Sequence, residues 1–136
     1  VGTGEMCQNR IVFKQFLENK SLDFCQIDSC RLASLNEIIP ILLMSSKSNI
    51  PVIAHAGGVG LCEYVQHLNI INQLIITNNT TYLSEYAESC SEHLTNPSII
   101  KSGHYVTPMN SGYSAIIKED SIKKFQFPNG NYWKGK

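Results

Sequence analysis

The stretch IPVIAHAGGVGLCEYVQHLNII, residues 50–71, decides the predicted fold. Its apolar start is typical of a parallel strand that is covered on both faces. The glycines of residues 56–60 form a turn, and residues 61–71 are predicted to be a helix. A strand followed by a short loop and a helix is the repeating unit of parallel α/β folds. The strand ends on His55, at the end where such folds place their chemistry.

Two upstream stretches repeat this pattern. VGTGE (1–5) ends on Glu5, and DFCQID (23–28) ends on Asp28. The spacings from Glu5 to Asp28 and from Asp28 to His55 are 23 and 27 residues, about the length of one βα unit. We therefore expect these three side chains at one edge of a parallel sheet.

The intervening segments are predicted to be helices. Residues 8–19 have apolar side chains at helical spacing. Residues 35–47 follow two candidate N-caps, Ser34 and Asn36. Asn36 is favoured, because it places Pro40 in the first turn, where the missing N–H costs nothing.

Beyond residue 72 the pattern weakens. QLIIT (73–77) is predicted to be a fourth strand and residues 82–94 a fourth helix. The predicted fold is therefore α/β with about four βα units over residues 1–96, which are too few to close an eight-stranded barrel. Residues 97–136 are expected to form a loop-rich tail with one or two strands.

Composition excludes several classes of function. The chain has 136 residues with 11 basic and 11 acidic side chains, so its charge favours neither nucleic acid nor an acidic membrane. No run of about 18 apolar residues and no signal peptide are present. The five cysteines are irregularly spaced and are expected to be reduced thiols of an intracellular protein. The chain starts without Met inside a predicted strand, so we expect it to be part of a longer protein.

Each candidate site also has a structural explanation. A carboxylate next to an imidazole suits acid–base catalysis, but Asp28 and His55 could equally be a surface Asp and a satisfied His. Glu5 could bind a metal or simply be solvated. The glycine-rich loop of residues 55–60 permits close approach of a ligand to a helix N-terminus, or forms only a tight turn.

Four longer motifs indicate a family. They are GEMCQNRIVFKQFL (4–17), DFCQIDSCRL with a following S-x-NE (23–37), HAGGVGLCEYVQHL (55–68) and GYSAIIKEDSIKKFQFPNGNYW (112–133). Together they resemble the C-terminal half of L-fuconate dehydratases, in the mandelate-racemase branch of the enolase superfamily. The resemblance implies that residues 1–96 form the C-terminal half of a modified TIM-type (β/α) barrel, and that the tail, residues 97–136, packs on a capping domain. It also implies removal of the proton alpha to a substrate carboxylate, with Mg²⁺ stabilising the enediolate.

The resemblance also implies roles for individual residues. Glu5 matches the third of three carboxylate ligands of Mg²⁺. Asp28 and His55 match a dyad in which the His is the general acid that helps the 3-hydroxyl leave. Glu85 matches an acid that supports the enediolate.

Several family features are absent from the chain. The K-x-K lysines, one of them the base, and the first two metal carboxylates belong to earlier strands of the family. The family also often has a Glu where this chain has Thr80 or Thr81, and a Pro where it has Ala54. The chain alone is therefore expected to lack the activity.

The intact protein is expected to be a Mg²⁺-dependent hydro-lyase of a small acid sugar, converting L-fuconate to 2-keto-3-deoxy-L-fuconate. It is expected to bind neither nucleic acid nor membrane, to form a homo-oligomer, and to be mitochondrial or cytoplasmic. Two alternatives remain: a non-catalytic half barrel with a structural or binding role, and a barrel that binds phosphate through residues 55–60.

Overall fold

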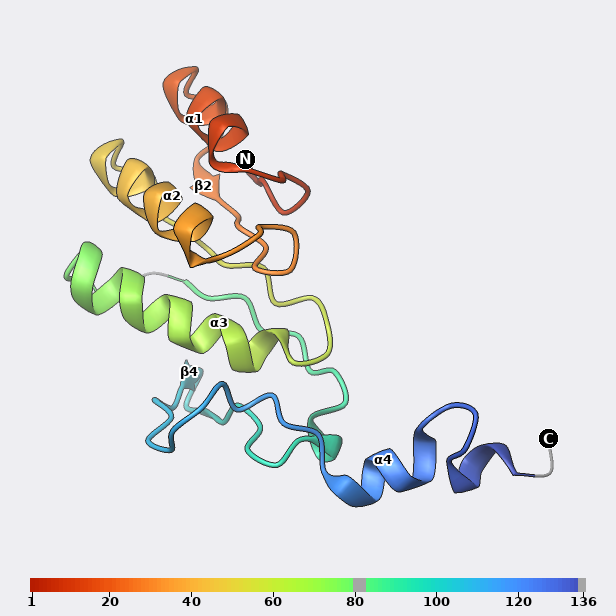
Figure 1. Cartoon of the computed structure of the whole chain (residues 1–136). Coiled ribbons are helices and arrows are strands. Elements are labelled where there is room, and N and C mark those ends of the chain that lie inside the picture. The colour runs from red at the N-terminus through yellow and green to blue at the C-terminus, as the bar shows by residue number, and fades with distance from the viewer. Residues whose placement is uncertain (80–82, 135–136) are drawn as a thin grey trace.

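The computed structural model describes residues 1–79 and 83–134. The elements of the first part are β1 (Gly2–Thr3), α1 (Arg10–Glu18), β2 (Phe24–Cys25), α2 (Leu35–Lys47), α3 (Leu61–Ile70) and the π-helix η1 (Ile71–Ile76). Those of the second part are η2 (Ser91–His93), β3 (Ile100–Lys101), β4 (His104–Tyr105), α4 (Glu119–Phe125) and η3 (Asn131–Trp133). Helices α1, α2 and α3 lie one below another, long loops connect them at the right, and β4 lies below α3 (Figure 1).

Three short strand segments run parallel, as predicted. Thr3 of β1 lies opposite Cys25 of β2, and Cys25 in turn forms a parallel bridge with Val52. The backbone N–H of His55 then donates to the carbonyl of Ile27 at 2.7 Å. The ends of the second and third predicted strands are therefore adjacent, which confirms this part of the predicted sheet.

The first helix follows the predicted pattern. The side chain of Asn9 accepts hydrogen bonds from the N–H groups of Ile11 and Val12 and so caps α1. Phe13 and Leu17, one turn apart, are its buried residues. They belong to a core that α1, α2 and α3 form with the strand segments: Phe13, Leu17, Leu22, Cys25, Ile27, Leu32, Ile38, Ile41, Leu42, Val52, Ala54, Ala56, Cys62, Val65 and Leu68.

The predicted start of α2 is wrong. The helix begins at Leu35 with Ser34 as N-cap, so Pro40 lies inside it rather than in its first turn. Proline cannot donate to the carbonyl four residues earlier, and that carbonyl, of Asn36, instead accepts from the guanidinium of Arg10 at 3.3 Å. Arg10 also forms an ion pair with Glu37 at 3.0 Å. The bond from Arg10 at the start of α1 thus replaces the hydrogen bond to Asn36 that Pro40 cannot make. The local sequence around Pro40 did not indicate this contact.

The fourth βα unit was also predicted incorrectly. Residues 73–77 are not a strand, because Ile71–Ile76 continue α3 as a π-helix. Neither glycine nor proline stands between residues 61 and 76 to end the helix, and a short apolar run does not distinguish strand from helix. The predicted helix over 82–94 is not formed: residues 83–89 are irregular, and only η2 is helical. Residue 82 lies outside the described residues, as do Thr80 and Thr81.

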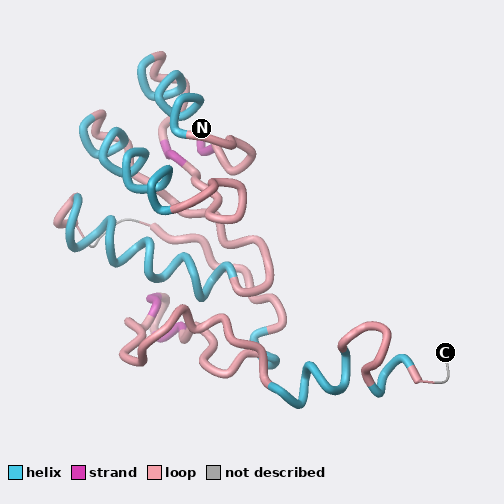
Figure 2. The backbone as a smooth tube through the Cα atoms, viewed as in Figure 1, coloured by secondary structure: helices cyan, strands magenta, loops and turns pink. Residues whose placement is uncertain are grey.

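The tail has both predicted and unpredicted elements. Strands β3 and β4 form an antiparallel hairpin, in agreement with the one or two strands expected there. The helix α4 was not predicted. It extends away from the layered part together with η3 (Figures 1 and 2). None of the helices in the described parts of the chain is both long and apolar enough to cross a bilayer.

Candidate active site

The strand segments present their polar side chains on one face. Successive residues of a strand point to opposite faces. Cys25 and Ile27 are fully buried in the core shared with the helices, so Gln26 and Asp28 belong to the opposite face. By the same alternation His55 lies opposite the buried Ala54. The residues predicted as a dyad therefore share the face that is turned away from the helices.

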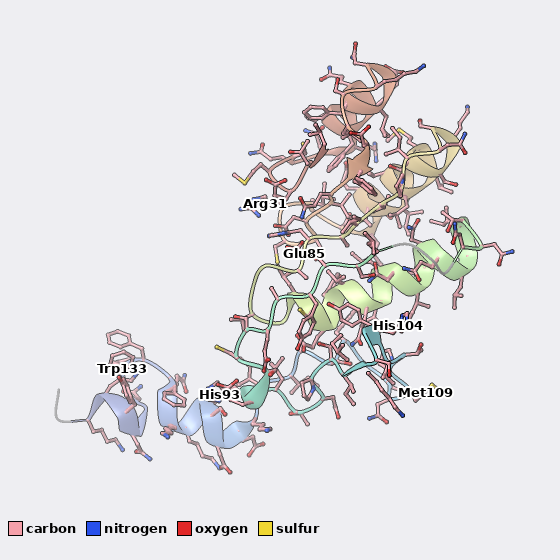
Figure 3. All side chains as sticks on the ribbon, turned by 180° about the vertical axis from the view of Figure 1, so that it is seen from behind. Arg31, Glu85, His93, His104, Met109 and Trp133 are labelled. Carbon is pink, nitrogen blue, oxygen red and sulfur yellow. The ribbon has the colours of Figure 1, made fainter. Side chains whose placement is uncertain are left out.

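On this face His55 contacts Glu85. The ring Nδ1 of His55 lies 3.1 Å from Oε2 of Glu85. The same oxygen accepts hydrogen bonds from the backbone N–H of Ala56 at 3.0 Å and from Nε2 of Gln26 at 3.0 Å. The side chains of His55 and Glu85 are 21% and 31% exposed, so both are partly in contact with solvent. Figure 3 shows Glu85 beside the strand segments, far from Trp133 of the tail.

The backbone around Glu85 is fixed by two further contacts. The hydroxyl of Tyr105 in β4 donates to the carbonyl of Glu85 at 2.7 Å. Burial, and next a hydrogen bond with Cys62, raise the pKa of Tyr105, so its hydroxyl remains a donor at neutral pH. Cys62 of α3 also meets the backbone of Ala87, whose N–H lies 3.4 Å from its Sγ. The hairpin and α3 together therefore place an irregular segment next to His55.

Asp28 has a different partner from the one predicted. Its residue is 1% exposed, and its carboxylate accepts from the N–H of Cys30 at 2.7 Å and from the guanidinium of Arg31. Both partners lie in the turn directly after Asp28, where a short acidic side chain readily bonds to its own backbone. Among the described contacts His55 pairs with Glu85 and not with Asp28. The predicted dyad geometry is therefore not the one observed.

Glu5 stands in the turn after β1, next to a glycine that nothing larger can replace. Gly4 has φ +126°, and a Cβ at this position would lie 2.7 Å from the carbonyl oxygen of Gln26 and from the ring of Phe13. Glu5 is partly exposed and accepts from the N–H of Gly4 at 3.1 Å. Burial, and next the charge of Glu5, raise the pKa of Cys7.

The described residues do not by themselves form a metal site. In the described ranges no three His, Cys, Asp or Glu side chains are grouped closely enough to hold an ion. Mg²⁺ requires near-octahedral oxygen ligation, and Glu5 offers one carboxylate.

The glycine-rich loop shapes the position of the imidazole. A Cβ on Gly57 would lie 2.6 Å from Cε1 of His55, so glycine here leaves room for the ring. Gly60 precedes α3 with φ +77°, a conformation that glycine adopts without strain.

Sequence reasoning missed three contributors to the site: Gln26, Arg31 and Tyr105. Gln26 had a usable signal, because it stands two residues before Asp28 and strand alternation puts both on one face. Tyr105 had none, since it approaches from a hairpin about twenty residues after Glu85 in the chain.

The chain resembles known proteins over nearly its whole length. The family description "Enolase C-terminal domain-like" matches residues 1–121. The chain is 49% identical over 135 residues to mitochondrial enolase superfamily member 1 of Xenopus laevis, a match that covers 98% of this chain and 30% of that protein. It is 45% identical over 128 residues to L-galactonate dehydratase of Hypocrea jecorina, covering 94% of this chain and 28% of that protein.

Solved structures agree in fold. The crystal structure of human mitochondrial enolase superfamily member 1 superposes with a TM-score of 0.90 at 48% identity, covering 98% of this chain and 30% of that one. A putative galactarate dehydratase of Agrobacterium radiobacter, with sodium and L-malate bound, superposes with a TM-score of 0.69 at 18% identity, covering 90% of this chain and 34% of that one. The latter likeness shows the fold alone.

These matches extend over the parallel strands, the helices and the edge that carries His55 and Glu85. The chain spans about 30% of the length of the curated relatives that it matches. It has an α/β fold consistent with half of a TIM barrel, and it belongs to the enolase superfamily, in the C-terminal domain-like family.

Proposed function

We propose that the protein containing this chain is an acid-sugar dehydratase, and that His55 is the acid that protonates the departing 3-hydroxyl. The observation that carries this proposal is the contact of His55 Nδ1 with a carboxylate at the open edge of the parallel strands. A carboxylate partner stabilises an imidazolium and orients its ring. With Nδ1 engaged, Nε2 is the atom that remains to deliver a proton to a substrate.

The relatives support the reaction class. One is named L-galactonate dehydratase, and the resemblance to fuconate dehydratases implies that a proton alpha to a carboxylate is removed. Loss of that proton and of the hydroxyl on the next carbon gives an enol, which becomes the 2-keto-3-deoxy acid. The base that takes the proton is proposed to lie outside this chain.

Glu5 is proposed as one ligand of Mg²⁺. A carboxylate oxygen suits this ion, and Glu5 is partly exposed at the end of β1. Bound Mg²⁺ would supply positive charge next to the substrate carboxylate. The remaining ligands are proposed to come from strands outside this chain.

Glu85 and Asp28, the two carboxylates near His55, are proposed to have different roles. Glu85 contacts His55 directly, so we assign it the orientation of the imidazole in addition to its predicted support of the enediolate. Asp28, bonded to Arg31 and Cys30, would orient His55 only after its side chain turns away from the guanidinium.

Substitutions in the full-length protein test these assignments. His55→Asn should reduce dehydration by about a hundredfold or more, the usual range for loss of a general acid, while exchange of the alpha proton persists. Glu5→Gln should weaken Mg²⁺ binding and reduce both reactions. Dehydration is measured as product ketone, exchange as deuterium incorporation, and Mg²⁺ affinity by titration.

The proposal fails if His55→Asn dehydrates at nearly the wild-type rate. His67→Asn is the matched control, because His67 lies in α3 near Tyr113 and does not contact Glu85 in the described contacts. A comparison of Asp28→Asn with Glu85→Gln then identifies the working partner of His55. The geometry predicts the larger loss of turnover for Glu85→Gln.

L-fuconate is the first substrate to assay, with L-galactonate beside it. The two acids differ by the hydroxyl on the terminal carbon, and a site built to bond a hydroxyl strongly rejects the analogue that lacks it. A ratio of kcat/KM values therefore tells which acid the pocket fits. A mitochondrial location, proposed from the names of the relatives, is tested by localising the full-length protein in cells.

A further inference from the structure

Three donors converge on a single oxygen of Glu85. They are Nδ1 of His55, the N–H of Ala56 and Nε2 of Gln26, at 3.1, 3.0 and 3.0 Å. The first belongs to the reacting group and the second to the backbone. Among the described contacts, Gln26 is therefore the side chain that bonds the Glu85 carboxylate without having been assigned any chemistry.

The backbone of Gln26 is held firmly. Its N–H donates to the carbonyl of Thr3 at 2.9 Å, and its own carbonyl abuts Gly4, where even a methyl group would clash. Its neighbours Cys25 and Ile27 are locked in the core. The amide consequently projects from a rigid strand toward the irregular segment that carries Glu85.

We propose that Gln26 is a positioning residue for His55 and that it acts through Glu85. Its amide holds Oε2 where this oxygen accepts from Nδ1 of His55. An ionised carboxylate can only accept hydrogen bonds, so Nδ1 carries the hydrogen and Nε2 faces the substrate side. A neutral donor serves this purpose without adding a charge next to Glu85.

Gln26 and Tyr105 form hydrogen bonds with different parts of Glu85. Tyr105 bonds the backbone carbonyl of Glu85, whereas Gln26 bonds its carboxylate. Loss of the tyrosine hydroxyl would loosen the segment as a whole. Loss of the glutamine amide would leave the backbone in place and free the carboxylate to rotate away from His55.

The first test measures the tautomer of the His55 imidazole and needs no substrate. In the full-length protein, nitrogen NMR shifts of His55 report which ring nitrogen carries the hydrogen. Gln26→Met keeps the length of the side chain but removes the donor. The ratio of the Nδ1–H to the Nε2–H form should fall about fivefold, the factor expected for loss of one hydrogen bond.

The second test is kinetic and rests on the proposed dehydratase function. Gln26→Met should lower kcat for dehydration about fivefold with KM nearly unchanged, because the amide touches Glu85 and not the substrate. Gln15→Met, on the exposed side of α1, is the control for a Gln-to-Met change and should alter neither readout. If Gln26→Met does not fold, Gln26→Asn, whose amide is one methylene too short to reach, should shift both readouts in the same direction.

The two tests have separate negative outcomes, so the failure of one proposal can be told from the failure of the other. A tautomer ratio within twofold of wild type in a folded Gln26 variant overturns the positioning role, whatever the activity. Absence of dehydration in the wild-type protein overturns the proposed function and leaves the tautomer measurement to decide the role of Gln26. A change in KM with constant kcat would make Gln26 a substrate-binding residue and also overturn the proposal.

Discussion

Two regions of this molecule differ in how much of each is buried in a core: the layered part, formed by α1, α2, α3 and the strand segments, and the tail, residues 97–136. All members of the main buried core lie between Phe13 and Leu68, where strands and helices cover each other. The tail beyond residue 97 has a two-stranded hairpin, a short helix and many exposed apolar side chains, including Met109 at 90% and Phe127 at 74% exposure. The first region carries Gln26 and His55, Glu85 reaches them from an irregular segment, and among the described contacts the tail adds the bond of Tyr105 to the Glu85 carbonyl. Chemistry that needs precise geometry thus rests on the densely packed part.

The largest expected difference concerns two phenylalanines. Phe13 is 0% exposed, so Phe13→Ala should lower the free energy of unfolding by about 3–5 kcal/mol. Phe127 is mostly exposed and packs edge-on against Trp133, so Phe127→Ala should cost less than about 1.5 kcal/mol. Denaturant titration of the two variants measures both. Equal costs would show that another part of the protein covers the tail, and the contrast between the regions would disappear.

A smaller difference is expected between two glycines with positive φ. In Gly4→Ala the new methyl group meets the backbone oxygen of Gln26 and the ring of Phe13, so the variant should lose about 2–4 kcal/mol. It should also displace Glu5 and weaken Mg²⁺ binding by the full-length protein. Gly103, in the hairpin turn, has φ +77° but open space around it. Gly103→Ala should therefore cost only about 1 kcal/mol and leave Mg²⁺ binding intact.

If Gly103→Ala destabilises as much as Gly4→Ala, the crowding at Gly4 is not the cause of the loss. Thermal unfolding and Mg²⁺ titration of the two variants separate the backbone cost, which both share, from the clash, which only Gly4→Ala has.

The smallest effect concerns pH. Burial, offset in part by a hydrogen bond with Ser45, raises the pKa of Cys25 from 9.0 to about 11. A group with a raised folded pKa stabilises the fold fully below its unfolded pKa, and this contribution disappears as the pH rises. Stability should therefore fall by up to about 1 kcal/mol per pH unit between pH 9 and 11. Cys25→Ala should reduce this slope, while Tyr105, whose pKa is also raised, continues to contribute above about pH 10.

Thiol labelling at pH 8 gives an independent check on Cys25. Cys90 is exposed and should react at once, whereas Cys25 should react only when the fold opens. Rapid labelling of Cys25 in the folded protein would contradict its place in the core.

The predictions that succeeded were those that depend on local pattern. Apolar runs at the spacing of one βα unit placed Asp28 and His55 at adjacent strand ends, and the backbone bond from His55 to Ile27 confirms that these ends are adjacent. The π-helix Ile71–Ile76, which replaces most of the predicted strand over 73–77, could not be foreseen, because a short apolar run fits either element. Where α2 begins depended on Arg10, which compensates for the proline from another helix.

The sequence by itself determined the parallel arrangement, the family and the strand ends that carry Asp28 and His55, because apolar runs, their spacing and motifs are local properties. Only the tertiary structure decided which carboxylate meets His55. The carboxylate of Asp28 accepts from Arg31 in the turn that follows it. Glu85 contacts His55 from a segment thirty residues further along the chain. That segment has no regular structure, and its place depends on Tyr105 and Cys62. Contacts between residues so far apart in the chain follow from the packing of the whole domain and leave no periodic signal in the sequence.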